Sequence, residues 1–68
     1  MNQVEVNNAL NAAFNSNKSR AQFSLLAVGE DRFDVVIRYG SPDAERAKML
    51  VAQVLGAQLN ECRLSRPL

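Results

Sequence analysis

The sequence contains no histidine and no tryptophan, and its 68 residues include a single cysteine, Cys62. Histidine is the side chain that most often serves as general acid, general base or metal ligand near neutral pH. A single cysteine cannot form an internal disulfide bond. These absences exclude Ser-His-Asp and Cys-His catalysis and every histidine-ligated metal site.

Long apolar runs and a strong charge of one sign are also absent. No stretch of 18 apolar residues exists to span a bilayer, and the start MNQVEVNNAL resembles no signal peptide, so we expect a cytoplasmic protein. Eight Lys and Arg residues balance seven Asp and Glu residues, which leaves a net charge of +1. Neither GxxxxGK[ST] nor GxGxxG occurs, so we expect no nucleotide and no other cofactor.

The 47% of hydrophobic residues is high enough for a folded chain rather than a disordered one. A chain this short forms one domain, here residues 1–68, and buries only about 60% of the surface that its unfolded form exposes. The sequence therefore predicts a single folded domain with a thin core.

The first expected element is a helix that begins with a capping box, in which Asn2 precedes Glu5 by three residues. Its apolar residues recur at helical spacing and form one narrow stripe, made of Val6, Leu10, Ala13 and Phe14. The polar, turn-forming segment 15–19 ends this helix.

Two strand-like runs, 21–28 and 33–39, predict a β-hairpin around the segment 29–32. If odd positions share the core face, the aligned residues are Ala21, Phe23, Leu25 and Ala27 beside Phe33, Val35, Ile37 and Tyr39. Shifting the register by one position would place Phe23 beside Arg38, so the first register is favoured. It implies a loop of three or five residues and leaves Leu26, Val28 and Val36 on the outward face.

A second helix is expected from Pro42 to about Leu59, with the Ser41 hydroxyl as its cap. One broad face gathers Ala44, Ala47, Leu50, Val51, Val54, Leu55 and Ala57, and can cover the hairpin. The segment 61–66 alternates polar and apolar residues and forms either a short third strand at an edge or a frayed tail. The expected fold class is α+β, in the order helix, strand, strand, helix and a possible last strand.

Few groups for catalysis remain. Cys62 beside Arg63 could act as a reactive thiol, but a half-buried apolar role explains it better. Glu30 and Asp31 belong to a loop, where solvation explains acids, and the acids after Pro42 suit the start of a helix. We therefore expect no catalytic residues, no metal site and no enzyme.

The second helix also carries apolar residues on its far side. Ala52 and Gly56 are small residues one turn apart, flanked by Met49 and Leu59, and this arrangement favours close approach of another chain. The alternative is that the first helix covers this side internally. A further candidate surface is the outward face of the hairpin. The predicted interface consists of Met49, Ala52, Gly56, Leu59, Leu26 and Val36, and the predicted rim charges are Glu30, Asp31, Arg32 and Arg38.

Unpaired apolar surface on a small domain without catalytic groups favours association. We expect a small protein-binding module, acting as inhibitor, adaptor or subunit on a larger protein, and homodimeric. Compact accessory proteins of bacteria and phages fit this description. The alternative is a nucleic-acid-binding regulator with a basic edge of Lys18, Arg20, Arg32, Arg38, Arg63 and Arg66, whose binding would weaken steeply with salt. The sequence identifies neither partner nor pathway, and no membrane partner is expected.

Overall fold

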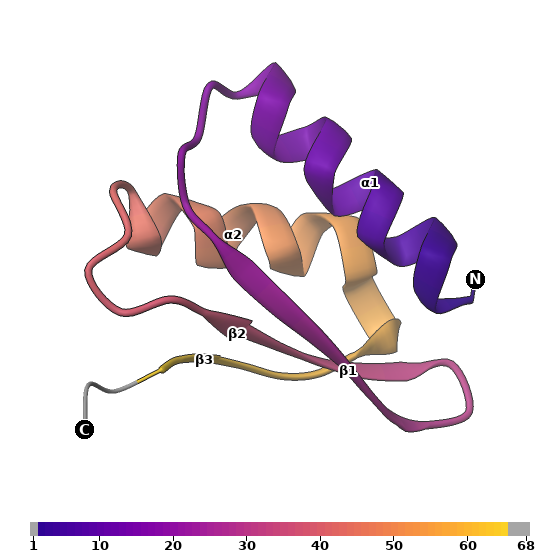
Figure 1. Cartoon of the computed structure of the whole chain (residues 1–68). Coiled ribbons are helices and arrows are strands. Elements are labelled where there is room, and N and C mark those ends of the chain that lie inside the picture. The colour runs from indigo at the N-terminus through magenta and orange to yellow at the C-terminus, as the bar shows by residue number, and fades with distance from the viewer. Residues whose placement is uncertain (1, 66–68) are drawn as a thin grey trace.

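The computed structural model describes residues 2–65 of the chain and has the α+β class. Two helices lie on one face of a three-stranded sheet (Figure 1). The elements, in chain order, are α1 (Gln3–Ser16), β1 (Phe23–Gly29), β2 (Arg32–Ile37), α2 (Ala44–Leu55), a 3-10 turn (Gly56–Gln58) and β3 (Leu59–Leu64). The predicted helix-strand-strand-helix order and the additional strand are confirmed.

The N-terminal cap of α1 is the predicted capping box. The Glu5 N–H donates to Asn2 Oδ1 over 2.9 Å, and the Asn2 N–H donates to Glu5 Oε1 over 3.2 Å. These two bonds satisfy donors that the first turn of a helix leaves without partners. The apolar stripe is confirmed as well, because Val6, Leu10 and Phe14 are all buried.

The hairpin of β1 and β2 has the predicted register. Phe23 lies opposite Ile37 and Leu25 opposite Val35, so these odd positions face the core, whereas the predicted core residue Ala27 pairs with Phe33 but is exposed near the turn. Ala27 and Phe33 are separated by five residues, one of the two predicted lengths, but a bulge and the pairing of Gly29 with Arg32 reduce the turn to two residues. Asp31 takes a positive φ of 54° in this turn, a left-handed conformation that aspartate tolerates better than most residues.

The prediction for Tyr39 is wrong. β2 ends at Ile37, and the Tyr39 side chain is 58% exposed rather than part of the core. The chain leaves the sheet here because Gly40, with φ of +84°, turns it toward α2.

The predicted start of α2 is also wrong. The helix begins at Ala44 and not at Pro42, and its N-cap is Asp43, which has a positive φ of 60° and no side-chain capping bond. The Ser41 hydroxyl is engaged elsewhere, because it accepts the N–H of Gln22 over 3.2 Å. This bond ties the loop before α2 to the start of β1.

The helix also ends earlier than the predicted Leu59. α2 stops at Leu55 because Gly56 adopts φ of 55° and ψ of −123°, which an α-helix cannot contain. Ala57 therefore leaves the predicted buried face and is exposed, while Leu59 begins β3.

β3 pairs with β2 in parallel, which makes β2 the central strand and β1 and β3 the two edges. The predicted edge strand at 61–66 thus exists, but it begins two residues earlier and ends at Leu64; residue 66 lies outside the described residues. The connection from β2 to β3 passes through α2, as a parallel pairing requires.

The core lies between the two helices and the inner face of the sheet. Phe14 of α1 and Phe23 of β1 meet edge to face, with ring centroids 5.3 Å apart, and so join helix and sheet. The buried residues are Val6, Leu10, Phe14, Phe33, Val35, Ile37, Ala47, Leu50, Val51 and Leu55.

Candidate functional site

The outer face of the sheet is the first candidate surface, because both helices cover the opposite face (Figure 1). Leu26 of β1 is 48% exposed there, and Val36 of β2 is partly exposed. The strand register places both side chains on the outward face, as predicted, together with Ser24 of β1. Val28 is also 48% exposed, but it lies at the bulge of β1, where the register gives it no partner. The hairpin half of this face thus carries an exposed apolar patch around Leu26 and Val36.

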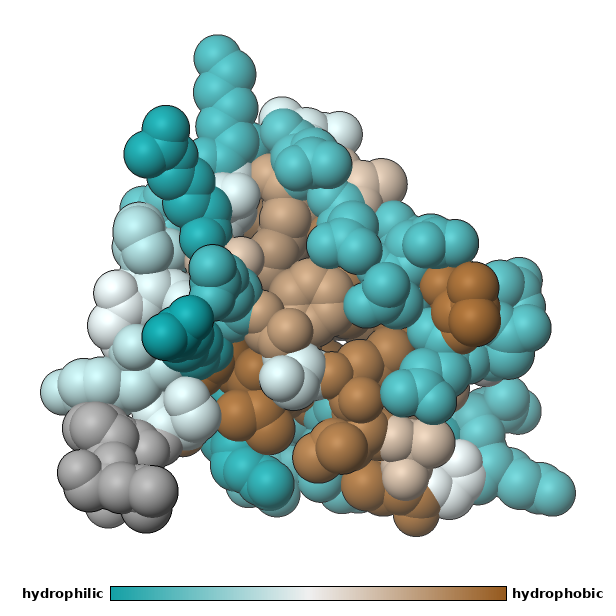
Figure 2. All heavy atoms as spheres, in the orientation of Figure 1, coloured by the Kyte–Doolittle hydropathy of each residue, from teal (hydrophilic) through white to brown (hydrophobic). Residues whose placement is uncertain are grey.

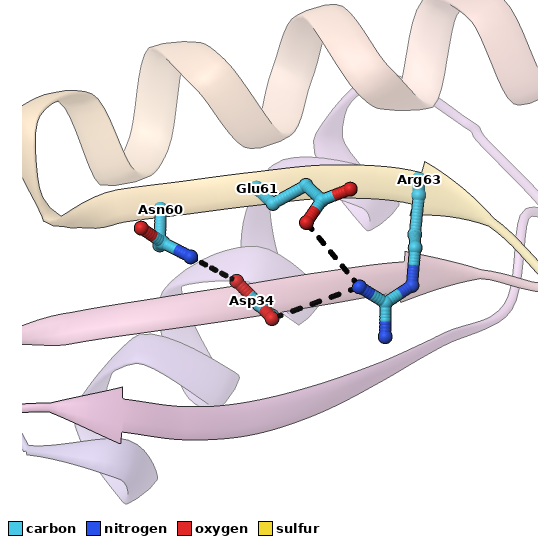
Figure 3. A network of polar contacts seen from close by, with 4 residues as sticks. All are labelled: Asp34, Asn60, Glu61 and Arg63. Atoms are coloured by element: carbon cyan, nitrogen blue, oxygen red, sulfur yellow. Dashed lines mark hydrogen bonds and ion pairs between the residues drawn. The ribbon is translucent and has the colours of Figure 1, made fainter.

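A polar network occupies the other half of the outer face, between β2 and β3 (Figure 3). Asp34 is 9% exposed; its Oδ1 accepts from Asn60 Nδ2 over 2.9 Å, and its Oδ2 lies 3.8 Å from Arg63 Nη1. Arg63 Nη1 also lies 3.4 Å from Glu61 Oε2. The network holds β3 against β2 and balances the charge of Arg63 with two carboxylates.

Asp34 occupies an even position of β2, opposite Leu26, and its side chain therefore lies on the outward face. A carboxylate within an otherwise apolar strand is the signal that a partner exists, because an unpaired charge there would be costly. The partners Asn60 and Arg63 could not be found from the sequence, since they depend on the parallel pairing of β3.

The solvent side of α2 is the second candidate surface. Met49 is 64% exposed, and Ala52 and Gly56 are exposed as well, so α1 does not cover this side. Leu59 does not join them, because it belongs to β3 and packs partly buried against the core. The structure thus brings together three of the four residues predicted for this surface.

The predicted rim charges do not form one rim. Glu30 and Asp31 make the hairpin turn, and Arg32 begins β2 at that end, whereas Arg38 follows the opposite end of β2. The six residues of β2 separate the two arginines by about 20 Å. Charges at opposite ends of the sheet can orient a partner lying along it, but they do not surround one spot.

The basic edge predicted for nucleic acid is likewise divided. Arg20 and Arg38 line one hollow of about 200 Å³, in which Tyr39 and Ser41 also take part. Arg38 Nη1 donates to Gln22 Oε1 over 2.8 Å, and Arg63 is paired with carboxylates on β3. Arg66 lies outside the described residues. The four arginines therefore do not form one continuous basic track along the surface; they are Arg20, Arg32, Arg38 and Arg63.

The thiol of Cys62 lies half-buried in β3. Burial raises its pKa, and the nearby Lys48 opposes this effect only in part. A raised pKa reduces the thiolate fraction at neutral pH, and the thiolate is the nucleophilic form. Cys62 is accordingly suited to packing rather than to covalent chemistry.

Within residues 2–65, no group of three or more acidic or cysteine side chains is placed to hold a metal ion. Over the same part of the chain, neither helix has the length and apolar character needed to cross a membrane. Comparison of the chain with protein families, curated proteins and solved structures yields no match.

Proposed function

We propose that the protein is a non-enzymatic protein-binding module of the cytoplasm, which acts by docking on a larger protein as inhibitor, adaptor or subunit. The observation that carries this proposal is the uncovered apolar patch on the outer face of the sheet, where Leu26 is 48% exposed and Val36 is partly exposed although the helices pack on the other face. A small domain gains stability by covering such a face, and a partner protein covers it most simply.

The geometry of the outer face also supports specificity. The apolar residues Leu26 and Val36 lie beside the polar group formed by Asp34 and Arg63. Apolar contact supplies affinity, whereas fixed charges at its border select the partner and its orientation.

The test replaces Leu26 by Asp on this face. Because Leu26 is about half exposed, its replacement leaves the fold intact but places a charge in the proposed contact. We expect the wild-type protein to capture a stoichiometric, nuclease-resistant protein from lysate of its source cells, and L26D to capture at least about tenfold less.

The matched control is Ala12→Asp, because Ala12 is exposed on α1, away from the outer face. A12D should capture as much partner as the wild type. Capture that is equal for L26D and the wild type would contradict docking through this face. Loss of all bound protein after nuclease treatment, together with steep salt dependence, would instead support the nucleic-acid alternative.

We further propose that the module forms a homodimer through the solvent side of α2, where Met49 and Ala52 are exposed. Replacing Ala52 by Arg introduces a long charged side chain into that contact. We expect the wild type to have about twice the 7.5 kDa chain mass by light scattering, and A52R to have the mass of one chain. Asn8→Arg, on the exposed side of α1, should remain dimeric; a monomeric wild type or a dimeric A52R would overturn this assignment.

A further inference from the structure

Among residues 2–65, no strand lies beside the outer edge of β1, and this edge carries outward-pointing backbone groups. The Arg38 N–H donates to the Gln22 carbonyl over 2.8 Å, directly across the hairpin. In an antiparallel pair, hydrogen-bonded positions alternate with positions whose backbone groups point away. The N–H and C=O groups of Phe23, Leu25 and Ala27 therefore point out from the edge of the sheet.

Helix α1 forms one wall beside this edge. Gln3 Nε2 donates to the outward carbonyl of Leu25 over 3.2 Å. A hollow of about 340 Å³ is lined by Gln3, Val4, Asn7 and Leu25. A second hollow of about 390 Å³ is lined by Asn7, Asn11, Ala21, Gln22 and Phe23. The two adjoin at Asn7 and together form the α1–β1 groove.

The α1–β1 groove has an apolar floor and an amide wall. Phe23 and Leu25 are half-buried in the floor, while Asn7 and Asn11 line the wall. In Figure 2, pale brown and brown spheres lie between the teal side chains of α1 and the brown group over β1. Such a groove offers contact to alternate side chains of an extended chain, and its amides offer hydrogen bonds to polar ones.

The bond from Gln3 shows that the outward groups of β1 accept an amide donor. A side-chain amide here occupies the place that the N–H of an added strand would take. Because the hydrogen bond from Gln3 is exposed to solvent, replacing it by one from a backbone N–H of a bound chain costs little free energy.

We propose that the α1–β1 groove binds an extended peptide segment of the partner as a fourth strand, antiparallel to β1. This inference rests on the proposed function and names the form of the bound segment. The segment carries apolar residues at alternate positions toward the floor and hydrogen-bonds to Phe23, Leu25 and Ala27.

The charged side chains at the two ends of β1 indicate which charged residues the bound segment carries at its own ends. Arg20 and Arg38 lie at the start of β1, whereas Glu30 lies at the hairpin end. An antiparallel segment ends near the arginines, so it carries an acidic residue at its C-terminal end and a basic residue at its N-terminal end.

A single extended segment suits this edge better than a second copy of the chain. Antiparallel pairing of two β1 strands would bring both α1 helices to the same face of the joined sheet, where packed helices need 8–10 Å between their axes. It would also displace the Gln3 side chain from the Leu25 carbonyl in both copies. A single extended segment has no helix of its own and displaces one such bond.

The probe is the fluorescein-labelled peptide Lys-Thr-Val-Thr-Val-Thr-Asp, blocked at both ends, and the readout is fluorescence anisotropy. In the proposed pairing, each Val side chain faces the floor and its N–H points to β1, while each Thr N–H points away. N-methylation of the central Thr should change the affinity by less than about threefold. N-methylation of either Val should weaken binding at least about tenfold.

Protein variants test the same contact from the other side. Ala27→Pro removes an outward N–H at an exposed edge position, where proline is tolerated, and should weaken binding by about tenfold. Ala27→Val keeps the N–H and should bind as the wild type does. In the wild type, the amides of Leu25 and Ala27 should exchange rapidly with solvent and become protected when the peptide binds.

Absence of binding at about 1 mM peptide, or equal weakening by methylation at Val and Thr, would overturn the inference. L26D separates it from the proposed function, because Leu26 lies on the outer face and its replacement should leave peptide binding unchanged. Capture of a partner that depends on Leu26 without any peptide binding would reject the groove alone. Peptide binding without such capture would reject the outer face alone.

Discussion

Replacement of Val51 by aspartate should leave the chain unfolded. Val51 has no exposed surface and lies on the face of α2 that packs into the core. Burying an unpaired carboxylate costs several kcal/mol, and a domain of 68 residues has a total stability of only about 3–10 kcal/mol. We expect V51D to lack the cooperative urea transition, measured by circular dichroism, that the wild type shows.

The control is Gln53→Asp, two residues further along α2, where the side chain is exposed. Q53D should lose less than about 1 kcal/mol, mainly because an acid near the C-terminal end of a helix opposes its dipole. A cooperative transition in V51D close to that of Q53D would show that the buried face of α2 is assigned wrongly.

Replacement of Gly56 by L-alanine should cost about 1–3 kcal/mol, because the backbone there has φ of 55° and ψ of −123°. L-amino acids that carry a Cβ rarely adopt these backbone angles, whereas glycine adopts them without strain. No atom lies within 4 Å of the position that a Cβ would occupy, so the cost comes from the backbone and not from a collision. The measurement is the free energy of unfolding in urea.

Two controls separate backbone strain from other effects. Gly29→Ala should change the free energy of unfolding by less than about 1 kcal/mol, since Gly29 has no positive φ and its added Cβ would meet only Arg32 at 3.8 Å. D-alanine at position 56, introduced by chemical synthesis, should retain full stability because its mirror-image backbone preference matches these angles. Equal destabilisation by D- and L-alanine would contradict the strain argument.

Local patterns predicted much of the fold. The capping box and the stripe of Val6, Leu10 and Phe14 involve residues a few positions apart, so their spacing alone defines α1. The register of the hairpin followed from parity, because a slip by one residue would have turned Phe23 and Leu25 to the outer face.

Contacts between distant residues were not predicted. Ser41 appeared to be a helix cap, but its hydroxyl accepts from Gln22, 19 residues earlier. The parallel pairing of β3 depends on how α2 crosses the sheet, and only this pairing removes Leu59 from the helix. No local sequence pattern predicts the bond between Ser41 and Gln22 or the parallel pairing of β3.

The candidate site was predicted in part for the same reason. Leu26, Val36, Met49 and Ala52 lie at the surface, as their periodicity indicates. The α1–β1 groove was not predicted from the sequence. Asn7 and Asn11 are distant in sequence from Phe23, and they line a common hollow with it only because α1 lies beside β1. The hydrogen bond from the Gln3 side chain to the Leu25 carbonyl joins residues far apart in the sequence, so no local pattern predicts it.

The parallel pairing of β3 also orders the assembly of the sheet in time. β1 and β2 meet through a two-residue turn, whereas β3 reaches β2 only after the chain has closed a loop that contains α2. Until then β2 is itself an open edge with the apolar run Val35-Val36-Ile37, a segment able to pair with other chains. The pairing of β3 therefore closes an edge that is prone to aggregation, in addition to completing the native sheet.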